Sequence, residues 1–299
     1  MDVAITGSSG LIGKQLKTVL RAEGHRPISL VRRPARGADE IQYDPAAGEL
    51  DSAALEGVDA VVNLAGAGIG DQRWTDKYKQ QILTSRVETT SLVANALAGL
   101  DAKPTVFLSG SAIGVYGNRG DEVQTEDSPP ADTFLADVVT QWETAAQPAI
   151  NAGIRTAFLR TGIVLSRRAQ VLTRLLPLFK LGVGGKFGNG RQYWSWISID
   201  DHVKAILFLL DGDISGPVNL TAPNPVTNAE FAKTLGNVLR RPAIIPIPRF
   251  GPSILFGEEL TQALLFDSAR VEPTVLNETD FAFDYPGLEV ALRATLQKW

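Results

Sequence analysis

Val3-Ala4-Ile5-Thr6-Gly7-Ser8-Ser9-Gly10-Leu11-Ile12-Gly13 is the stretch that decides the fold of this chain. It is an apolar run that meets a Thr-Gly turn and then changes to helical spacing of apolar residues up to Leu20. The pattern predicts a strand, a tight glycine loop and a helix, which together open a βαβ unit. Gly7 is expected to turn sharply, Gly10 to let the backbone approach a diphosphate, and Gly13 to let the helix lie close to the strand.

The spacing of these glycines, TGxxGxxG, differs from the GxGxxG of ordinary dehydrogenases, and a glycine triplet can serve loop conformation alone. Its place in the first strand-to-helix turn, and a second strand that ends about 20 residues later, favour a nucleotide site. The free N–H groups at the start of the helix would face phosphates there. The predicted dinucleotide contacts in this stretch are Gly7, Ser9, Gly10, Leu11, Ile12 and Gly13.

Two arginines follow the second predicted strand, Arg26–Val31. At this position a carboxylate would accept hydrogen bonds from an adenosine ribose, whereas arginine would bind a 2′-phosphate through charge-assisted hydrogen bonds. The sequence has Arg32 and Arg33 here and no carboxylate, which favours NADP(H) over NAD as the cofactor. The competing interpretation is a pair of solvated loop arginines.

Composition argues against several other classes of protein. The chain has 299 residues and a net charge of −4, so nucleic acid is not an expected partner. It has no cysteine and two histidines, which argues against disulfides, thiolate catalysis and a metal site. No apolar run approaches membrane-spanning length, and a strand that begins at residue 2 or 3 leaves no room for a signal peptide. We expect a cytoplasmic protein, monomeric or homodimeric, without a membrane partner and with a small-molecule substrate.

Strands and helices alternate over the first half of the chain. Further strands are predicted to begin near residues 40, 59, 104 and 154, with helices over 75–97 and 132–150 between them. This alternation predicts an α/β fold with a Rossmann-type doubly wound parallel sheet and right-handed crossovers.

From about residue 165 the pattern changes to short helices and glycine-rich loops. An apolar helix at 172–181 is broken by Pro177, and an alternating strand at 192–199 meets Asp200-Asp201, which are suited to cap the next helix. We predict a smaller, mainly helical C-terminal substrate domain. The expected division is an NADP-binding domain over 1–165, to which 196–221 return, and a substrate domain over 166–195 and 222–299.

The carboxyl ends of the central strands carry further candidate site residues, because these ends line the ligand crevice of a doubly wound sheet. Asn63, Leu64 and Ala65 are expected to pass close to the cofactor. Ser109 and Ser111 form a hydroxyl cluster that could hold a carbonyl or alcohol beside a nicotinamide, and Ser109 is included among the cofactor contacts. Both serines could equally satisfy backbone groups in a turn.

Arg86 stands in the middle of the helix predicted over 75–97. The pattern alone assigns such an arginine to a solvated helix face.

Several motifs together resemble a known family, the extended short-chain dehydrogenase/reductases, which include nucleotide-sugar epimerases and dehydratases. More closely, the chain is similar to a subgroup described as NADP-dependent epimerases or oxidoreductases. The resemblance covers essentially the whole chain. The motifs that carry it are Thr6–Gly13, Asn63–Gly66, Trp74, Ser85-Arg86, Ser109–Gly117, Trp142-Glu143, Leu159–Leu165, Leu181–Gly185, Trp196–Asp201 and Arg270–Pro273.

The resemblance implies a set of NADP contacts. It places Arg32 and Arg33 at the 2′-phosphate, Asn63 and Leu64 on the adenosine side, and a C-terminal substrate pocket beyond them. It also implies that Arg86 points inward from its helix, against the solvated interpretation. It further implies that Ile163 contacts the cofactor near its nicotinamide end.

One departure from the family pattern bears on catalysis. Extended members use a tyrosine with a lysine four residues later, and the lysine lowers the pKa of the tyrosine so that the phenol can shuttle a proton. Alignment of the helix on Glu143 puts Leu135 and Val139 at those positions. Alignment on Tyr116 puts Ala112 where the catalytic serine or threonine would fall, with Ser111 one residue away. Ser111 and Tyr116 are the remaining candidates for proton transfer.

Two hypotheses follow from the sequence. The first is an atypical NADP(H)-dependent oxidoreductase or nucleotide-sugar epimerase-like enzyme that acts on a small polar substrate. The second is a non-catalytic NADP(H)-binding sensor or regulatory protein, because a nucleotide-binding fold does not by itself imply turnover.

Overall fold

The structure is a computed structural model that describes residues 1–297. Eight strands form its central sheet: β1 (Asp2–Thr6), β2 (Arg26–Val31), β3 (Glu40–Asp44), β4 (Glu49–Leu50), β5 (Ala60–Asn63), β6 (Val106–Ala112), β8 (Arg155–Thr161) and β12 (Gly216–Leu220). The spatial order is β12-β8-β6-β5-β1-β2-β3-β4. Neighbouring strands are parallel, except that β4 pairs antiparallel with β3. The predicted doubly wound parallel sheet is confirmed.

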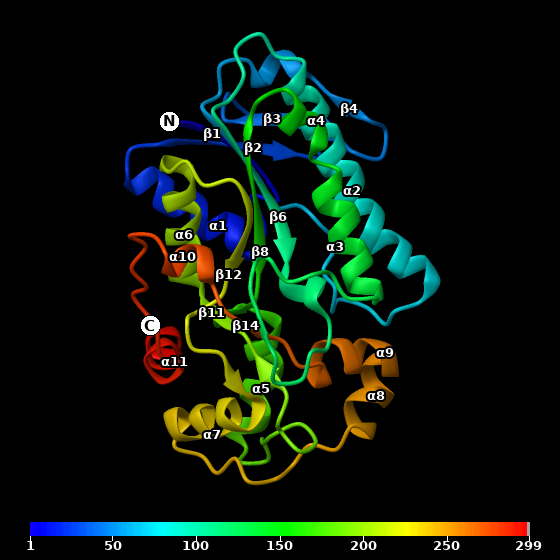
Figure 1. Cartoon of the computed structure of the whole chain (residues 1–299), viewed down its shortest axis with the longest axis vertical. Helices are drawn as coiled ribbons and strands as arrows, with labels where there is room; N and C mark the ends of the chain where they lie inside the picture. The colour runs from blue at the N-terminus through cyan, green and yellow to red at the C-terminus, as the bar shows by residue number, and fades with distance from the viewer. Residues whose placement is uncertain (298–299) are drawn as a thin grey trace.

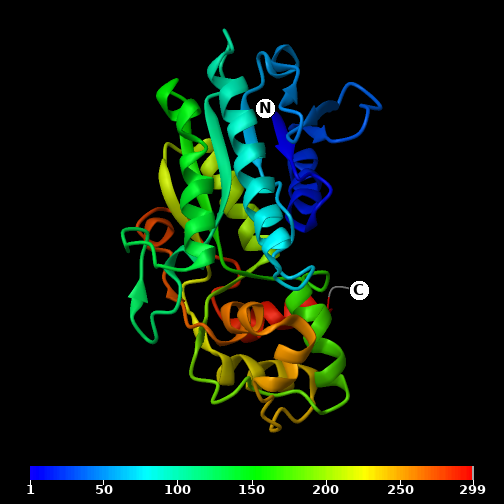
Figure 2. The ribbon, with the colours of Figure 1, turned by 90° about the vertical axis from the view of Figure 1, so that its right-hand side faces the viewer.

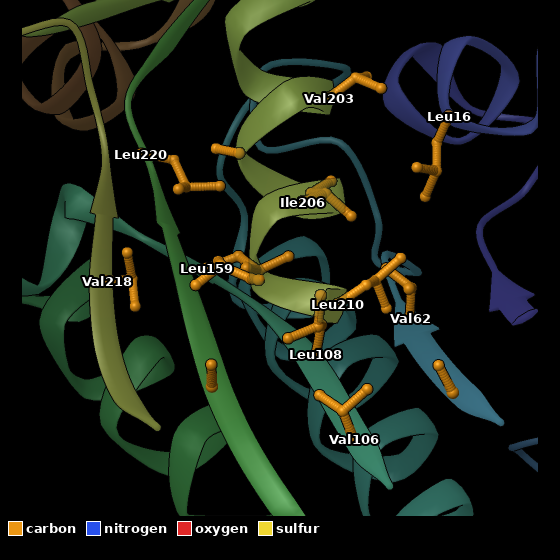
Figure 3. Close-up of a cluster of buried hydrophobic side chains, with 14 of the residues drawn as sticks. Leu16, Val62, Val106, Leu108, Leu159, Val203, Ile206, Leu210, Val218 and Leu220 are labelled. Carbon is orange, nitrogen blue, oxygen red and sulfur yellow. The ribbon is translucent and has the colours of Figure 1, made fainter. Parts of the chain in front are cut away.

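Helices cover both faces of the sheet, as Figures 1 and 2 show. One face carries α1 (Leu11–Ala22) and α6 (Ile199–Asp211), and the other carries α2 (Asp76–Ala98), α3 (Phe134–Thr144) and α4 (Gln147–Asn151). Side chains of each strand alternate between the two faces, because successive residues of a strand point to opposite sides. In β5, Val62 packs toward α1 and α6 while Val61 packs toward α2. Figure 3 shows the first of these layers, with Leu16 of α1 and Ile206 of α6 above the sheet.

The direction in which the sheet is built reverses between β1 and β5. From β1 the chain moves outward through β2 and β3, and then returns to place β5 on the other side of β1. In open α/β sheets, ligands bind outside the carboxyl ends of the strands at such a reversal. The glycine loop after β1 and residues 64–67 after β5 therefore flank the expected ligand crevice.

A smaller, mainly helical lobe lies beyond the carboxyl ends of the strands, in the lower half of Figure 1. It has its own apolar core, which includes Leu172, Phe179, Trp194, Phe231 and Leu292. Its helices are α5 (Gln170–Lys180), α7 (Asn228–Leu239), α8 (Phe250–Phe256), α9 (Glu258–Thr261), the π-helical turn η3 (Gln262–Phe266) and α11 (Leu288–Gln297). The domain boundaries given above stay a prediction.

Short elements connect the lobe to the sheet. The helix α10 (Thr274–Asn277) packs beside β12, and two 3₁₀ turns, η1 (Ser52–Leu55) and η2 (Ile113–Tyr116), follow β4 and β6. The paired short strands are β9 (Ile163–Leu165) with β11 (Trp196–Ser198), β10 (Tyr193–Trp194) with β13 (Val226–Thr227), and β7 (Val123–Gln124) with β14 (Arg270–Val271).

Three local predictions were wrong. The single helix over 132–150 is divided into α3 and α4, because Pro148 has no N–H to donate to the preceding turn. Pro177 lies inside α5 without ending it. The strand over 192–199 is divided into β10 and β11, which pair with different partners.

The cap of α6 also differs from the prediction. Ser198 is the N-cap residue, and its hydroxyl accepts a hydrogen bond from the Asp201 N–H.

No helix among residues 1–297 combines the length and apolarity needed to cross a membrane.

Candidate functional site

The glycine loop has the geometry that its sequence predicts. Gly7 has a φ of +63°, and a Cβ on it would lie 2.7 Å from the Leu64 backbone. A Cβ on Gly13 would lie 2.5 Å from the Gly7 carbonyl oxygen, so α1 can approach the loop only with glycine there. Gly10 is the N-cap residue of α1 and has no capping side chain. The first N–H groups of α1 are therefore available to an anion.

A buried hydrogen-bond chain holds the facing loop after β5. The Thr6 hydroxyl donates to Oδ1 of Asn63 (2.5 Å) and accepts from the N–H groups of Leu64 (3.1 Å) and Ala65 (3.2 Å). Nδ2 of Asn63 donates to the Thr90 hydroxyl (2.7 Å). Asn63 is fully buried, so its side chain supports the loop from within.

A cavity of about 1000 Å³, the first cavity, opens between these two loops. Its walls come from the loop after β1, α1, the end of β2, β3 and the residues that follow it, the loop after β5 and one side of α2. Seven of the predicted cofactor contacts line it: Gly7, Ser9, Gly10, Arg32, Arg33, Leu64 and Ala65. The other seven do not line it: Leu11, Ile12, Gly13, Asn63, Arg86, Ser109 and Ile163.

The two arginines at the end of β2 differ in their surroundings. Arg33 makes two hydrogen bonds to the Glu40 carboxylate, at 2.5 and 2.8 Å, and Glu40 also accepts from the Arg36 N–H. These bonds lower the pKa of Glu40 to about 2. Arg32 is exposed and has no hydrogen-bond partner in the described part of the chain. Glu40 lines the same cavity, and the sequence analysis missed it because it comes from β3 rather than from the end of β2.

Arg86 is buried, with 7% of its surface exposed, so the solvated interpretation was wrong and the inward orientation is confirmed. Its Nη1 donates to the Ile82 carbonyl (2.9 Å), and its guanidinium lies 5.0 Å from the Trp142 ring. No carboxylate within residues 1–297 forms an ion pair with it. Burial lowers the pKa of Arg86 to about 10, which leaves it charged at neutral pH.

A second cavity, of about 700 Å³, lies between the sheet and the smaller lobe. Arg86 and Ile163 line it, as do Leu135 and Val139, the two residues that the alignment on Glu143 predicts at the tyrosine and lysine positions. Gly66 lines the first cavity, and a Cβ on it would lie 3.1 Å from Cζ of Arg86. Arg86 therefore lies where the two cavities meet.

The two proton-transfer candidates lie elsewhere. Tyr116 is fully buried, its hydroxyl donates to Oδ1 of Asn219 (2.7 Å), and it accepts from Arg160 (3.0 Å). The Ser111 hydroxyl donates to the Glu143 carboxylate (2.6 Å), which forms an ion pair with Arg160 (2.9 Å). Neither residue lines either cavity.

Ser111 and Tyr116 thus belong to a buried polar network that joins β6, η2, α3 and β8, and their role in proton transfer stays a prediction. Ser109 is also fully buried, and its hydroxyl has no partner among residues 1–297.

Charged groups at the second cavity come from a segment of the predicted substrate domain in which the sequence indicated no individual site residue. These are Arg249, Glu258, Glu259 and Asp267. Their spacing follows no recognisable motif, and only the fold brings them together. Within residues 1–297, no three His, Asp or Glu side chains gather where they could hold a metal ion.

The reversal point of the sheet and the glycine loop beside it define a Rossmann-class protein. A model of the NAD dependent epimerase/dehydratase family matches residues 3–220, and a domain of unknown function, DUF1731, matches residues 247–295. The chain therefore belongs to the NAD-dependent epimerase/dehydratase family. The resemblance inferred from the motifs is confirmed.

Relatives match along almost the whole chain. The epimerase family protein ML0860 of Mycobacterium leprae is 42% identical over 97% of this chain and 94% of its own length. The human epimerase family protein SDR39U1 is 34% identical over 98% of this chain and 99% of its own length.

Two solved structures are similar to this fold. The crystal structure of human SDR39U1 (isoform 2) with NADPH has a TM-score of 0.91 and 32% identity, with full coverage of both chains. The nucleoside-diphosphate sugar epimerase from Corynebacterium glutamicum has a TM-score of 0.81 and 38% identity, over 99% of this chain and 58% of that chain.

Proposed function

We propose that this protein is an NADP(H)-dependent oxidoreductase or epimerase with an atypical proton-transfer group. The observation that carries the proposal is Arg86, a buried cation without a carboxylate partner at the junction of the two cavities. A buried charge is costly unless it is paired, so this position favours an anion bound across the junction. The diphosphate of a dinucleotide is such an anion, and the human relative SDR39U1 is described with NADPH.

The residues of the first cavity fit NADP(H). A side chain on Gly7 or Gly13 would collide with neighbouring backbone, and the start of α1 offers free N–H groups to a diphosphate. Arg32 would hold the 2′-phosphate, while Arg33 would share its guanidinium between that phosphate and Glu40. When bound, the nicotinamide supplies a hydride donor or acceptor.

The walls of the second cavity support an atypical mechanism. Leu135 and Val139 line it at the positions where the family resemblance expects tyrosine and lysine, and neither side chain can transfer a proton. The same two residues favour the alternative function, an NADP(H)-binding sensor without turnover. Oxidation of NADPH sustained by a purified substrate, and lost when the second cavity is mutated, would eliminate that alternative.

Side-by-side calorimetric titration with NADPH and NADH tests the cofactor proposal. The stripped protein should bind NADPH more tightly than NADH, and Arg32→Ala with Arg33→Ala should remove most of that preference. Each lost charge-assisted bond is worth roughly 1.5–3 kcal/mol. Arg21→Ala, an exposed arginine on α1, serves as the control and should leave both affinities unchanged. Equal weakening of NADPH and NADH would mean that Arg32 and Arg33 only shape the loop.

Location and assembly stay predictions. A cytoplasmic protein, monomeric or homodimeric, is proposed here, although one relative, the SDR39U1 homolog of Arabidopsis thaliana, is named as chloroplastic.

A further inference from the structure

We infer that the second cavity binds an uncharged, largely apolar molecule with a flat ring system and one hydrogen-bond acceptor, rather than a nucleotide sugar. The inference rests on the proposed function, because it assigns Arg86 to the cofactor. It also replaces the small polar substrate that the sequence suggested.

The walls of the second cavity are mostly aromatic and aliphatic. Trp74 and Phe134 meet edge to face, with ring centroids 5.1 Å apart, and Trp142, Trp194, Leu135 and Val139 complete the surface. Aromatic walls of this kind favour flat apolar ligands through stacked and edge-to-face contacts.

The indole N–H groups do not serve a ligand in this cavity. Nε1 of Trp74 donates to the Ile69 carbonyl (2.9 Å), and Nε1 of Trp142 donates to the Thr90 hydroxyl (2.9 Å). Nε1 of Trp194 is buried, inaccessible to solvent, and has no hydrogen-bond partner among residues 1–297. All three indoles therefore offer carbon surface to a bound molecule.

The hydroxyl groups in the wall are also bonded within the protein, with one exception. Ser195 donates to the Ala269 carbonyl (2.7 Å), and Thr161 donates to the Leu159 carbonyl (3.1 Å). The Thr133 hydroxyl accepts from the Ala136 N–H (3.2 Å) as the N-cap of α3. Tyr193 is the hydroxyl in this wall without a hydrogen-bond partner among residues 1–297. Because a polar substrate needs several partners, one free hydroxyl suits a single acceptor such as a carbonyl oxygen.

Charge excludes a diphosphate from this space. Apart from Arg86, the one cationic side chain in the described lining is Arg249, which is paired with Glu258 (3.0 Å). Glu259 is paired with Lys79 (2.5 Å), and Asp267 adds a further carboxylate. Once the cofactor neutralises Arg86, a nucleoside diphosphate would face these carboxylates with no unpaired cation in the described lining to receive it.

Prodan, an uncharged naphthyl ketone whose emission shifts to the blue in apolar surroundings, is a direct probe of this cavity. Titrated into NADPH-loaded protein, it should show a saturable blue shift that excess UDP-glucose does not reverse. Leu135→Asp should weaken binding by about tenfold or more, because an apolar contact is replaced by a carboxylate. Leu255→Asp, on the exposed side of α8, is the matched control and should leave binding unchanged.

Other outcomes would overturn the inference. These are displacement of Prodan by UDP-glucose, absence of a saturable shift, and loss of binding in Leu255→Asp rather than in Leu135→Asp. If Leu135→Asp does not fold, Tyr193→Phe decides, with an expected weakening of about two- to tenfold from one lost hydrogen bond. Unchanged affinity in that variant would then reject the inference.

Failure of the proposed function can be distinguished from failure of this inference, because Prodan is also titrated into protein without NADPH. Absence of NADPH binding by calorimetry rejects the cofactor proposal, whereas the Prodan titrations alone decide the chemistry of the second cavity.

Discussion

Two arginines of this chain are buried alike but differ in their partners. Arg86 and Arg160 are equally buried, at 7% exposure each. Arg160 is held by the Glu143 carboxylate through two hydrogen bonds, at 2.9 and 3.0 Å, whereas Arg86 has a backbone carbonyl and an aromatic ring. The partnered arginine stabilises the folded chain, and the unpartnered one is available to an anion.

We therefore expect Arg86→Met and Arg160→Met to have different effects on the free energy of unfolding. Arg86→Met removes an uncompensated buried charge, so the unloaded protein should keep or gain stability while NADPH binding weakens by roughly tenfold or more. Arg160→Met leaves the half-buried Glu143 carboxylate without its cationic partner, which should cost up to about 3–5 kcal/mol. Urea unfolding and calorimetry measure both effects. A large loss of stability in Arg86→Met would show that its main role is structural.

His202 predicts a specific dependence of stability on pH. It is fully buried on α6, its Nε2 lies 3.0 Å from the Thr161 hydroxyl, and Nδ1 has no partner among residues 1–297. Burial lowers the pKa of His202 from 6.5 to about 4, so the unfolded chain binds a proton more readily in this range. Its contribution to stability is present above pH 6.5 and is lost as the pH falls toward 4.

Between about pH 7.5 and about pH 5 this group should reduce the free energy of unfolding by about 2 kcal/mol. The His202→Gln variant should not show this decrease in the free energy of unfolding. Asp201 and Asp267, whose pKa values are raised by burial, act in the opposite direction and are shared by both proteins. Urea unfolding at the two pH values isolates His202, and an identical pH dependence in the variant would contradict the assignment.

At the scale of elements, the sequence predicted the features that depend on residues close together in the chain. The turn at Gly7, the close contact at Gly13 and the parallel order of the sheet follow from glycine freedom, apolar periodicity and the handedness of crossovers. The division of β10 from β11 and the clustering of Glu258 with Arg249 depend on contacts between distant segments. Periodicity in a single segment carries no information about such contacts.

Gly13→Ala tests the contact between α1 and the glycine loop. The added Cβ would lie 2.5 Å from the Gly7 carbonyl oxygen, so the helix or the loop must shift. We expect a loss of about 1–3 kcal/mol in stability, as for other overpacked sites, together with weaker NADPH binding. Gly37→Ala is the control, because a Cβ there meets nothing within 4 Å. Equal behaviour of the two variants in thermal unfolding and NADPH titration would reject the contact as a determinant of the site.

At the scale of the molecule, the proposed function would divide the dinucleotide between two cavities that the two parts of the chain line differently. The first cavity is lined by residues 7–89, whereas the second also takes its walls from the smaller lobe. Hydrogen bonds between residues 70–73 and the smaller lobe connect these parts. Arg174 donates to the Gly70 carbonyl (2.6 Å), and Arg73 donates to the Ile254 carbonyl (3.1 Å). A ligand that fills only the first cavity would not contact the aromatic walls of the second, because the two cavities share no lining residue. Such a ligand should leave those walls unchanged.

Comparison of 2′,5′-ADP with NADPH tests this division. Both should stabilise the protein against unfolding, by about 2.7 kcal/mol at a hundredfold excess over Kd. NADPH should also quench tryptophan emission, because Trp74, Trp142 and Trp194 line the second cavity, where the nicotinamide is proposed to lie. 2′,5′-ADP has no nicotinamide and should leave that emission unchanged. Equal quenching by the two ligands would mean that the cavities respond as one unit, whereas stabilisation by NADPH without quenching would place the nicotinamide outside the second cavity.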